Sequence, residues 1–166
     1  MGGRNMAVFR VIHEAGKYQD EATRDTVLQY IGQPQKIQHG LVGGLAVNFE
    51  TAALEINRLA RCFGQNHGIR LRHWIISLYP NELTLPEIAA FARQACAFYA
   101  GKYQIVYAVH EDVPHPHIHF VMNYISYLDG SRYRGDKQDY WAYIKEFGDV
   151  TLVKGFCAIL AADILR

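Results

Sequence analysis

The chain has 166 residues, of which 50% are hydrophobic and 20% are charged, and its formal net charge is +1. This length and balance fit one globular domain with a substantial core. The nearly neutral charge argues against a protein that binds nucleic acid through its net charge, so any DNA contact must come from local clusters of Lys and Arg.

The cysteines and the hydropathy pattern indicate the cellular compartment of the protein. Cys62, Cys96 and Cys157 are scattered, and their odd number and spacing form no disulfide or metal pattern, which is typical of a reducing compartment. No apolar run is long enough to span a bilayer, and the first residues carry no signal-peptide core. We therefore expect a cytoplasmic protein without membrane contact.

The apolar pattern predicts alternating strands and helices. In chain order these are a strand at 7–13, a helix at 21–31, a strand at 40–49, a helix at 51–63, a strand at 70–78, a helix at 85–99, strands at 103–109 and 115–126, a helix at 136–147 and a last helix from about 154. Thr84 is placed to cap the third helix, and the Gly43-Gly44 pair allows a close backbone approach in the second strand. Asp129-Gly130 indicates a tight turn. The order predicts an α/β sandwich in which helices cover a sheet with the hairpin 103–126 at its centre.

That hairpin carries an unusual concentration of histidine. Four of the eight histidines lie between His110 and His119. Alternation along a strand sends His115, His117 and His119 to one face, and a short loop between the strands would bring His110 to the same face. Three imidazoles on one face are hard to explain as core, although a lone histidine on a strand is usually a surface residue.

Imidazole nitrogens with open coordination positions suit a divalent metal ion that binds phosphate oxygens. A structural zinc site would need a fourth protein ligand, often Cys, and no Cys lies nearby in the sequence. The pattern therefore favours a catalytic metal over a structural one.

The same residues resemble a known family. The motif consists of His110-x-Asp112, His115-Pro-His117-x-His119 and Asn123, and it resembles the metal motif of conjugative relaxases of the MOBP type, in the HUH (His-hydrophobe-His) endonuclease superfamily. The segments 30–36, 46–48, 73–82 and 126–134 resemble further family segments in the same order, so the resemblance extends from about Tyr30 to Arg134. A Ser that some members place before the strand at 73 has no clean counterpart here.

The resemblance implies the relaxase fold, a central and mainly antiparallel sheet with helices on its faces and the HUH motif on a central strand. It implies a single DNA-nicking domain over residues 1–166, as the N-terminal part of a longer protein. The implied metal ligands are His110, His117 and His119, because in the family the first ligand precedes the HUH pair by seven residues, which selects His110 over His115. The implied cofactor is a divalent ion, Mn²⁺ or Mg²⁺, with Zn²⁺, Ni²⁺ or Co²⁺ as alternatives.

The implied activity is a site-specific transesterification of single-stranded DNA. Tyr30 would attack the scissile phosphate at an origin of transfer and form a 5′-phosphotyrosine, and Tyr18 is the alternative nucleophile. Asp112 would accept an N–H from a metal-bound imidazole or the proton of the tyrosine, and the sequence leaves both roles open.

The implied partners are single-stranded origin DNA and accessory relaxosome and coupling proteins. Lys36 follows the tyrosine motif and is the most specific candidate for DNA binding. Arg70 with Arg72, and Arg132 with Arg134, form two further pairs of candidates, each with the alternative of a solvated strand residue.

Two other readings stay open. A rolling-circle replication initiator or a single-strand transposase of the same superfamily would use similar histidines, but the early position of Tyr30 favours a relaxase. A module that only binds DNA or metal is the second alternative.

Overall fold

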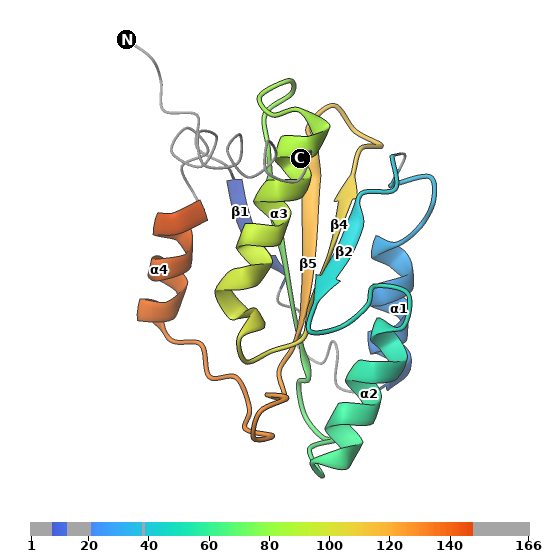
Figure 1. Cartoon of the computed structure of the whole chain (residues 1–166), viewed down its shortest axis with the longest axis vertical. Coiled ribbons are helices and arrows are strands. Elements are labelled where there is room, and N and C mark those ends of the chain that lie inside the picture. The colour runs from blue at the N-terminus through green and yellow to red at the C-terminus, as the bar shows by residue number, and fades with distance from the viewer. Residues whose placement is uncertain (1–7, 13–20, 38, 148–166) are drawn as a thin grey trace, which may run out of the picture.

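A five-stranded antiparallel sheet forms the centre of the fold (Figure 1). The structure is a computed structural model that describes residues 8–12, 21–37 and 39–147. The elements are β1 (Val8–Ile12), α1 (Glu21–Ile31), β2 (Val42–Leu45), α2 (Ala52–Cys62), β3 (Leu71–Ser77), α3 (Leu85–Ala100), β4 (Ile105–His110), β5 (His117–Asn123) and α4 (Lys137–Phe147). The strand order is β1-β3-β5-β4-β2, which puts β5 in the middle of the sheet.

The predicted order of elements is confirmed over the described residues, and so is the α/β architecture with the hairpin at its centre. The N-terminal cap of α3 is confirmed as well. The Thr84 side chain accepts from the backbone N–H of Glu87, and the Glu87 side chain accepts from the backbone N–H of Thr84. The helix predicted from residue 154 lies outside the described residues.

Two strands, β2 and β5, are much shorter than the predicted ranges 40–49 and 115–126. β5 begins at His117 and not at His115, because Pro116 has no N–H to give to a ladder; its carbonyl instead accepts from the backbone N–H of Leu78 at 2.9 Å. β2 ends at Leu45, because Ala46 adopts a positive φ of 60° that turns the chain away.

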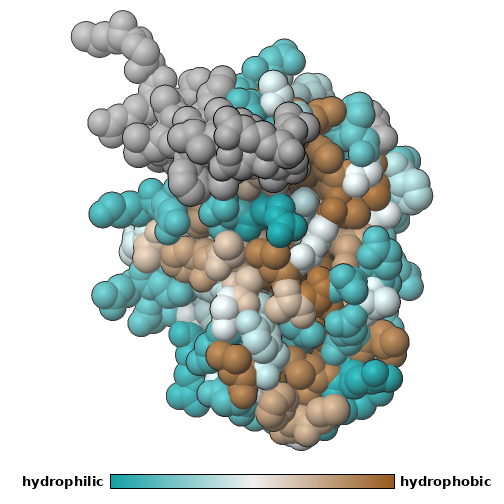
Figure 2. Space-filling view, viewed as in Figure 1, coloured by the Kyte–Doolittle hydropathy of each residue, from teal (hydrophilic) through white to brown (hydrophobic). Residues whose placement is uncertain are grey.

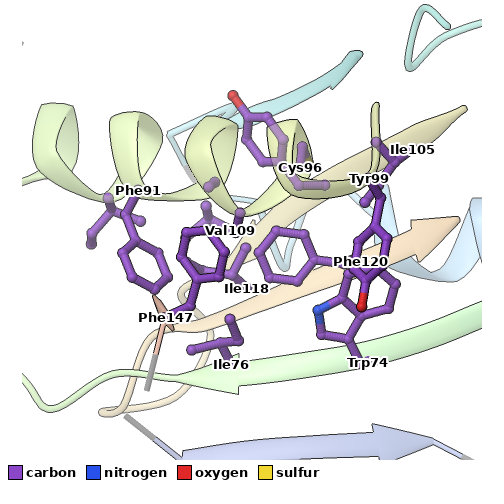
Figure 3. Close-up of a cluster of buried hydrophobic side chains, with 14 of the residues drawn as sticks. Trp74, Ile76, Phe91, Cys96, Tyr99, Ile105, Val109, Ile118, Phe120 and Phe147 are labelled. Carbon is purple, nitrogen blue, oxygen red and sulfur yellow. The ribbon is translucent and has the colours of Figure 1, made fainter. Parts of the chain in front are cut away.

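One face of the sheet packs against α3 and α4. The side chains of Ile118, Phe120 and Met122 in β5 alternate onto this face and are fully buried. Figure 3 shows Phe91, Cys96 and Tyr99 of α3 lying over the strands, with Trp74 of β3 beside Phe120. Trp74 stacks on Phe120 at a centroid distance of 5.3 Å and donates from Nε1 to the Tyr143 hydroxyl of α4 at 3.0 Å. This apolar packing fixes which side of β5 faces which layer.

The opposite face packs against α1 and α2. The apolar residues of this second core are Val27, Leu28 and Ile31 of α1, Ala52 and Ile56 of α2, and Leu71, Val106, Ala108 and Val121 of the sheet, with Val47 after β2. Arg24 of α1 is fully buried and donates from Nε to Oδ1 of Asn57 in α2 at 2.6 Å. The last turn of α1 is therefore held against the histidine-bearing side of the sheet.

The described surface seen from the α3 side alternates between polar and apolar side chains (Figure 2). Among the described residues no helix has the length and apolar character that crossing a membrane requires.

Gly44, near the end of β2, has no room for a side chain. A Cβ there would clash with the backbone carbonyl oxygen of Val47, which cannot move aside like the end of a flexible side chain. We expect Gly44→Ala to lower the free energy of unfolding by about 1–3 kcal/mol in urea denaturation.

Gly101→Ala is the matched control, since a Cβ at Gly101 meets nothing within 4 Å and its φ is −66°. This variant should be neutral or more stable by up to about 1 kcal/mol. Equal losses in the two variants would contradict the packing described for Gly44.

Candidate metal and nucleophile site

The histidines gather where β4 ends and β5 begins, at the end of the sheet beside the last turn of α1 (Figure 1). His110 pairs directly with His117 across the two strands, and His119 pairs with Ala108. Residues opposite each other in an antiparallel pair project to the same side, so His110, His117 and His119 all lie on the face that α1 covers.

His110 and His119 are the closest pair. Their rings lie 4.0 Å apart between centroids, and the two residues are 3% and 5% exposed. His110 donates from Nε2 to the backbone carbonyl of Ile31 at 2.8 Å, which leaves the lone pair of its neutral ring on Nδ1. This bond joins the end of β4 to the last residue of α1.

Tyr30 lies beside these two rings. Its ring is edge-on to His110 at 5.9 Å and to His119 at 6.1 Å between centroids. Tyr30 is 42% exposed, so its side chain is accessible to solvent. The structure thus brings the predicted nucleophile next to two of the predicted ligands, whereas Tyr18 lies outside the described residues.

Lys36 and Asp112 form an ion pair next to Tyr30. The Lys36 Nζ lies 3.1 Å from Oδ2 of Asp112 and 5.1 Å from the centroid of the Tyr30 ring. The bond to Asp112 and then the proximity of Tyr30 raise the pKa of Lys36, and the bond to Lys36 lowers the pKa of Asp112. The direct partner of the Asp112 carboxylate is therefore an ammonium group.

The donor set has the protonation state that a metal needs. Burial lowers the pKa of His110 and of His117, and burial together with the nearby His110 and His73 lowers the pKa of His119 to about 2. Neutral imidazole is the form that ligates metals, so the residues fit a divalent ion by their chemistry. In the conformation described for residues 8–12, 21–37 and 39–147, however, no three His, Cys, Asp or Glu side chains converge as a formed metal site.

His73 of β3 completes the row of imidazoles, and sequence reasoning did not include it among the site residues. Its Nε2 lies 2.9 Å from Nδ1 of His119, and it is 5% exposed. The two side chains meet because β3 pairs with β5, with His73 opposite Val121 and Ile75 opposite His119. Only the register of these two strands could have revealed the contact.

His115 departs from the predicted row. It lies before β5, exposed, with its ring edge-on to Tyr79 at 6.3 Å. The two rings border a hollow of about 310 Å³ that is lined by Ser77, Leu78, Tyr79, His115 and His117. The 47% exposed Tyr79 therefore offers an aromatic face next to His117.

Arg70 and Arg72, predicted to contact DNA, are buried. Arg72 projects to the α3 side of the sheet, opposite the histidines, and donates from Nη1 to the hydroxyls of Tyr99 at 2.9 Å and Tyr133 at 3.0 Å. Arg70 is 3% exposed and donates to the side chain of Asn66. Both guanidinium groups thus bind other side chains of the fold.

The other predicted basic pair divides. Arg132 donates to the backbone carbonyls of His67 and Ile69 and so ties the turn after β5 to the chain before β3. Arg134 is exposed. Lys36 and Arg134 are thus the two predicted DNA contacts that are not held by bonds to the backbone or buried in the core.

Comparisons with known proteins point to one family. A family model described as relaxase, MobA/VirD2-like, nuclease domain, matches residues 30–151. The chain is also 24% identical over 95 residues to "Protein rlx" of Staphylococcus aureus, which covers 57% of this chain and 30% of that protein. The chain therefore spans about a third of the length of this relative. No solved structure gives a significant match.

Burial of His119 predicts a loss of stability in acid when metal is chelated. The unfolded state takes up a proton below about pH 6.5 whereas the folded state, in which the pKa of His119 is about 2, does not. More protons bound on unfolding means that stability falls as the pH drops from 6.5 toward 2, by at most about 1.4 kcal/mol per pH unit for this one group.

Urea denaturation with EDTA at several pH values measures this slope, which His119→Gln should make shallower. His67→Gln, at an exposed histidine, should keep the wild-type slope. Equal slopes for wild type and His119→Gln would mean that the folded state does not exclude this proton.

Proposed function

Because the chain belongs to the relaxase family, as a MobA/VirD2-like nuclease domain, we propose that it nicks single-stranded DNA at an origin of transfer by transesterification. The nick would serve conjugative transfer or mobilisation of a plasmid or an integrative element. The observation that supports this most is the position of the Tyr30 ring, edge-on to His110 and His119 at 5.9 and 6.1 Å.

Tyr30 is the proposed nucleophile. Its hydroxyl oxygen forms a bond to the scissile phosphorus, and the bond from phosphorus to the 3′ oxygen breaks. The phenol loses its proton, the leaving 3′ oxygen gains one, and the 5′ phosphate stays on the tyrosine. A phenol ordinarily titrates near 10, so the reaction requires groups that stabilise negative charge at this place.

The proposed metal ligands are His110, His117 and His119. A divalent ion, when bound, supplies positive charge to the non-bridging phosphate oxygens. Mn²⁺ or Mg²⁺ is the ion that we propose, and the all-nitrogen donor set keeps Zn²⁺, Ni²⁺ and Co²⁺ as alternatives. The chain contributes three imidazoles whose lowered pKa values keep them neutral near pH 7.

Lys36 is the proposed cation at the nucleophile. Its ammonium group lies over the Tyr30 ring and can contact the scissile phosphate or the phenolate that forms. Asp112 holds this ammonium in place at 3.1 Å. Acceptance of the phenol proton by Asp112 remains the second role that we propose for it.

DNA would enter over the exposed residues around this end of the sheet. Lys36 is the proposed phosphate contact there, and Tyr79 offers a stacking surface for a base. Arg134 follows the opposite end of β5, and we propose it as a phosphate contact for DNA that extends beyond the site. Accessory relaxosome and coupling proteins are proposed partners in the cytoplasm. A rolling-circle initiator, a transposase or a module that only binds DNA is the alternative, and binding without cleavage would favour the last.

Replacing the nucleophile tests the reaction. Wild-type protein with Mn²⁺ and labelled single-stranded oligonucleotides from its origin region should form an adduct that resists SDS. Tyr30→Phe should reduce the adduct on the order of 10³-fold or more, because the phenylalanine ring has no hydroxyl to attack the phosphorus.

Tyr127→Phe is the matched control. Tyr127 lies after the end of β5 that is far from the histidines, and its hydroxyl donates to the carbonyl of Ala100. Loss of this hydroxyl should leave the adduct unchanged. A wild-type yield of adduct from Tyr30→Phe would refute the assignment of the nucleophile.

The exposed ring of Tyr79 predicts a stacking contribution to DNA binding. Tyr79→Leu should weaken binding of a single-stranded oligonucleotide by about 1–3 kcal/mol in fluorescence anisotropy, while Tyr79→Phe keeps the affinity because it keeps the ring. If both variants bind the oligonucleotide as tightly as the wild type does, the DNA does not stack on Tyr79.

A further inference from the structure

The contact between His73 and His119 joins two buried imidazoles through one hydrogen bond. His73 Nε2 lies 2.9 Å from His119 Nδ1, and the rings are 5.2 Å apart between centroids with an interplanar angle of 36°. Such a bond needs a proton on one nitrogen and a lone pair on the other.

The two possible directions of this bond differ in what they leave for a metal. If His73 donates, His119 is a neutral ring that carries its proton on Nε2, and neither of its nitrogens has a lone pair for an ion. If His119 donates from Nδ1, its lone pair is on Nε2 and is available. His119 can therefore act as a ligand only when His73 is the acceptor.

We infer that His73 is a positioning residue of the metal centre, whose Nε2 accepts the Nδ1–H of His119 and so holds His119 as the tautomer that ligates through Nε2. This inference rests on the proposed function, which makes His119 a metal ligand. In this arrangement a histidine accepts the hydrogen bond that a metal-bound imidazole more often donates to a carboxylate or a backbone carbonyl.

An imidazole acceptor has an electrostatic consequence. A carboxylate in this place would add a negative charge next to the ion, whereas neutral His73 orients His119 and adds none. The full charge of the ion then stays available for the phosphate oxygens of the substrate.

The position of His73 in the sheet gives the acceptor little freedom. Its backbone is fixed in β3, between β1 and β5, where His73 pairs with Ile12 on one side and with Val121 on the other. Its side chain is 5% exposed, so water does not readily replace it as the acceptor. A side chain without an acceptor at this position would leave the Nδ1–H of His119 without this partner.

The first test needs neither metal nor DNA. Long-range ¹H–¹⁵N NMR on the metal-free, 166-residue chain at pH 7.5 reports which nitrogen of His119 carries the proton. We expect the proton on Nδ1 in the wild type and in His73→Gln, whose amide oxygen can accept. A proton on Nε2 of His119 in the wild type would overturn the inference.

The second test measures Mn²⁺ affinity by electron paramagnetic resonance. His73→Leu should raise the Kd for Mn²⁺ by about 10–100-fold, as loss of such a partner does at other metal sites. His73→Gln should recover most of the affinity, which a side chain that only fills space would not do. Equal affinities for His73→Leu and His73→Gln would overturn the inference.

Two further outcomes separate the role of His73 from a failure to fold and from a failure of the proposed function. If His73→Leu does not fold, the tautomer in the wild type and in His73→Gln still decides the matter. If the wild type cleaves no DNA but carries the proton on Nδ1 and binds Mn²⁺ with the expected dependence on residue 73, the proposed function fails and the role of His73 stands.

Discussion

His110 donates from Nε2 to the carbonyl of Ile31, and this bond joins the two parts that the proposed chemistry requires, the histidines of the sheet and the end of α1. The carbonyls of a last helical turn have no partner within the helix, so a donor from the sheet satisfies one of them. Tyr30 precedes Ile31 in the same turn and is carried to the histidines by that contact. The position of the phenol therefore depends on the end of β4 as much as on α1.

The strand β5 serves two layers at once. Ile118 and Phe120 belong to the larger core under α3 and α4, while His117 and His119 face α1. Since side chains alternate along a strand, a slip by one residue would turn the imidazoles toward α3 and the apolar side chains toward α1. The stacking of Trp74 on Phe120 thereby also sets which way the histidines point.

Much of this arrangement follows from local sequence patterns. A strand, a short loop and a second strand with alternating histidines predict a hairpin with one polar face, and the register confirms that His110 meets His117. Alternation also says that two arginines share a face, but it does not say which layer covers that face, so the burial of Arg72 under α3 was not predictable. The partnership of His73 with His119 depends on the pairing of β3 with β5, 46 positions apart, and no local pattern encodes it.

The buried hydrogen bond between Arg24 of α1 and Asn57 of α2 affects the site, although neither residue belongs to it. Two bonds from the Arg61 guanidinium to the Glu21 carboxylate, each 2.8 Å, reinforce the same pair of helices at the surface. A guanidinium enclosed in the interior is costly to leave without its acceptor, so α1 cannot slide along α2 freely. α2 thus braces the helix that carries Tyr30, and the buried Arg24 side chain helps to fix the position of the proposed nucleophile.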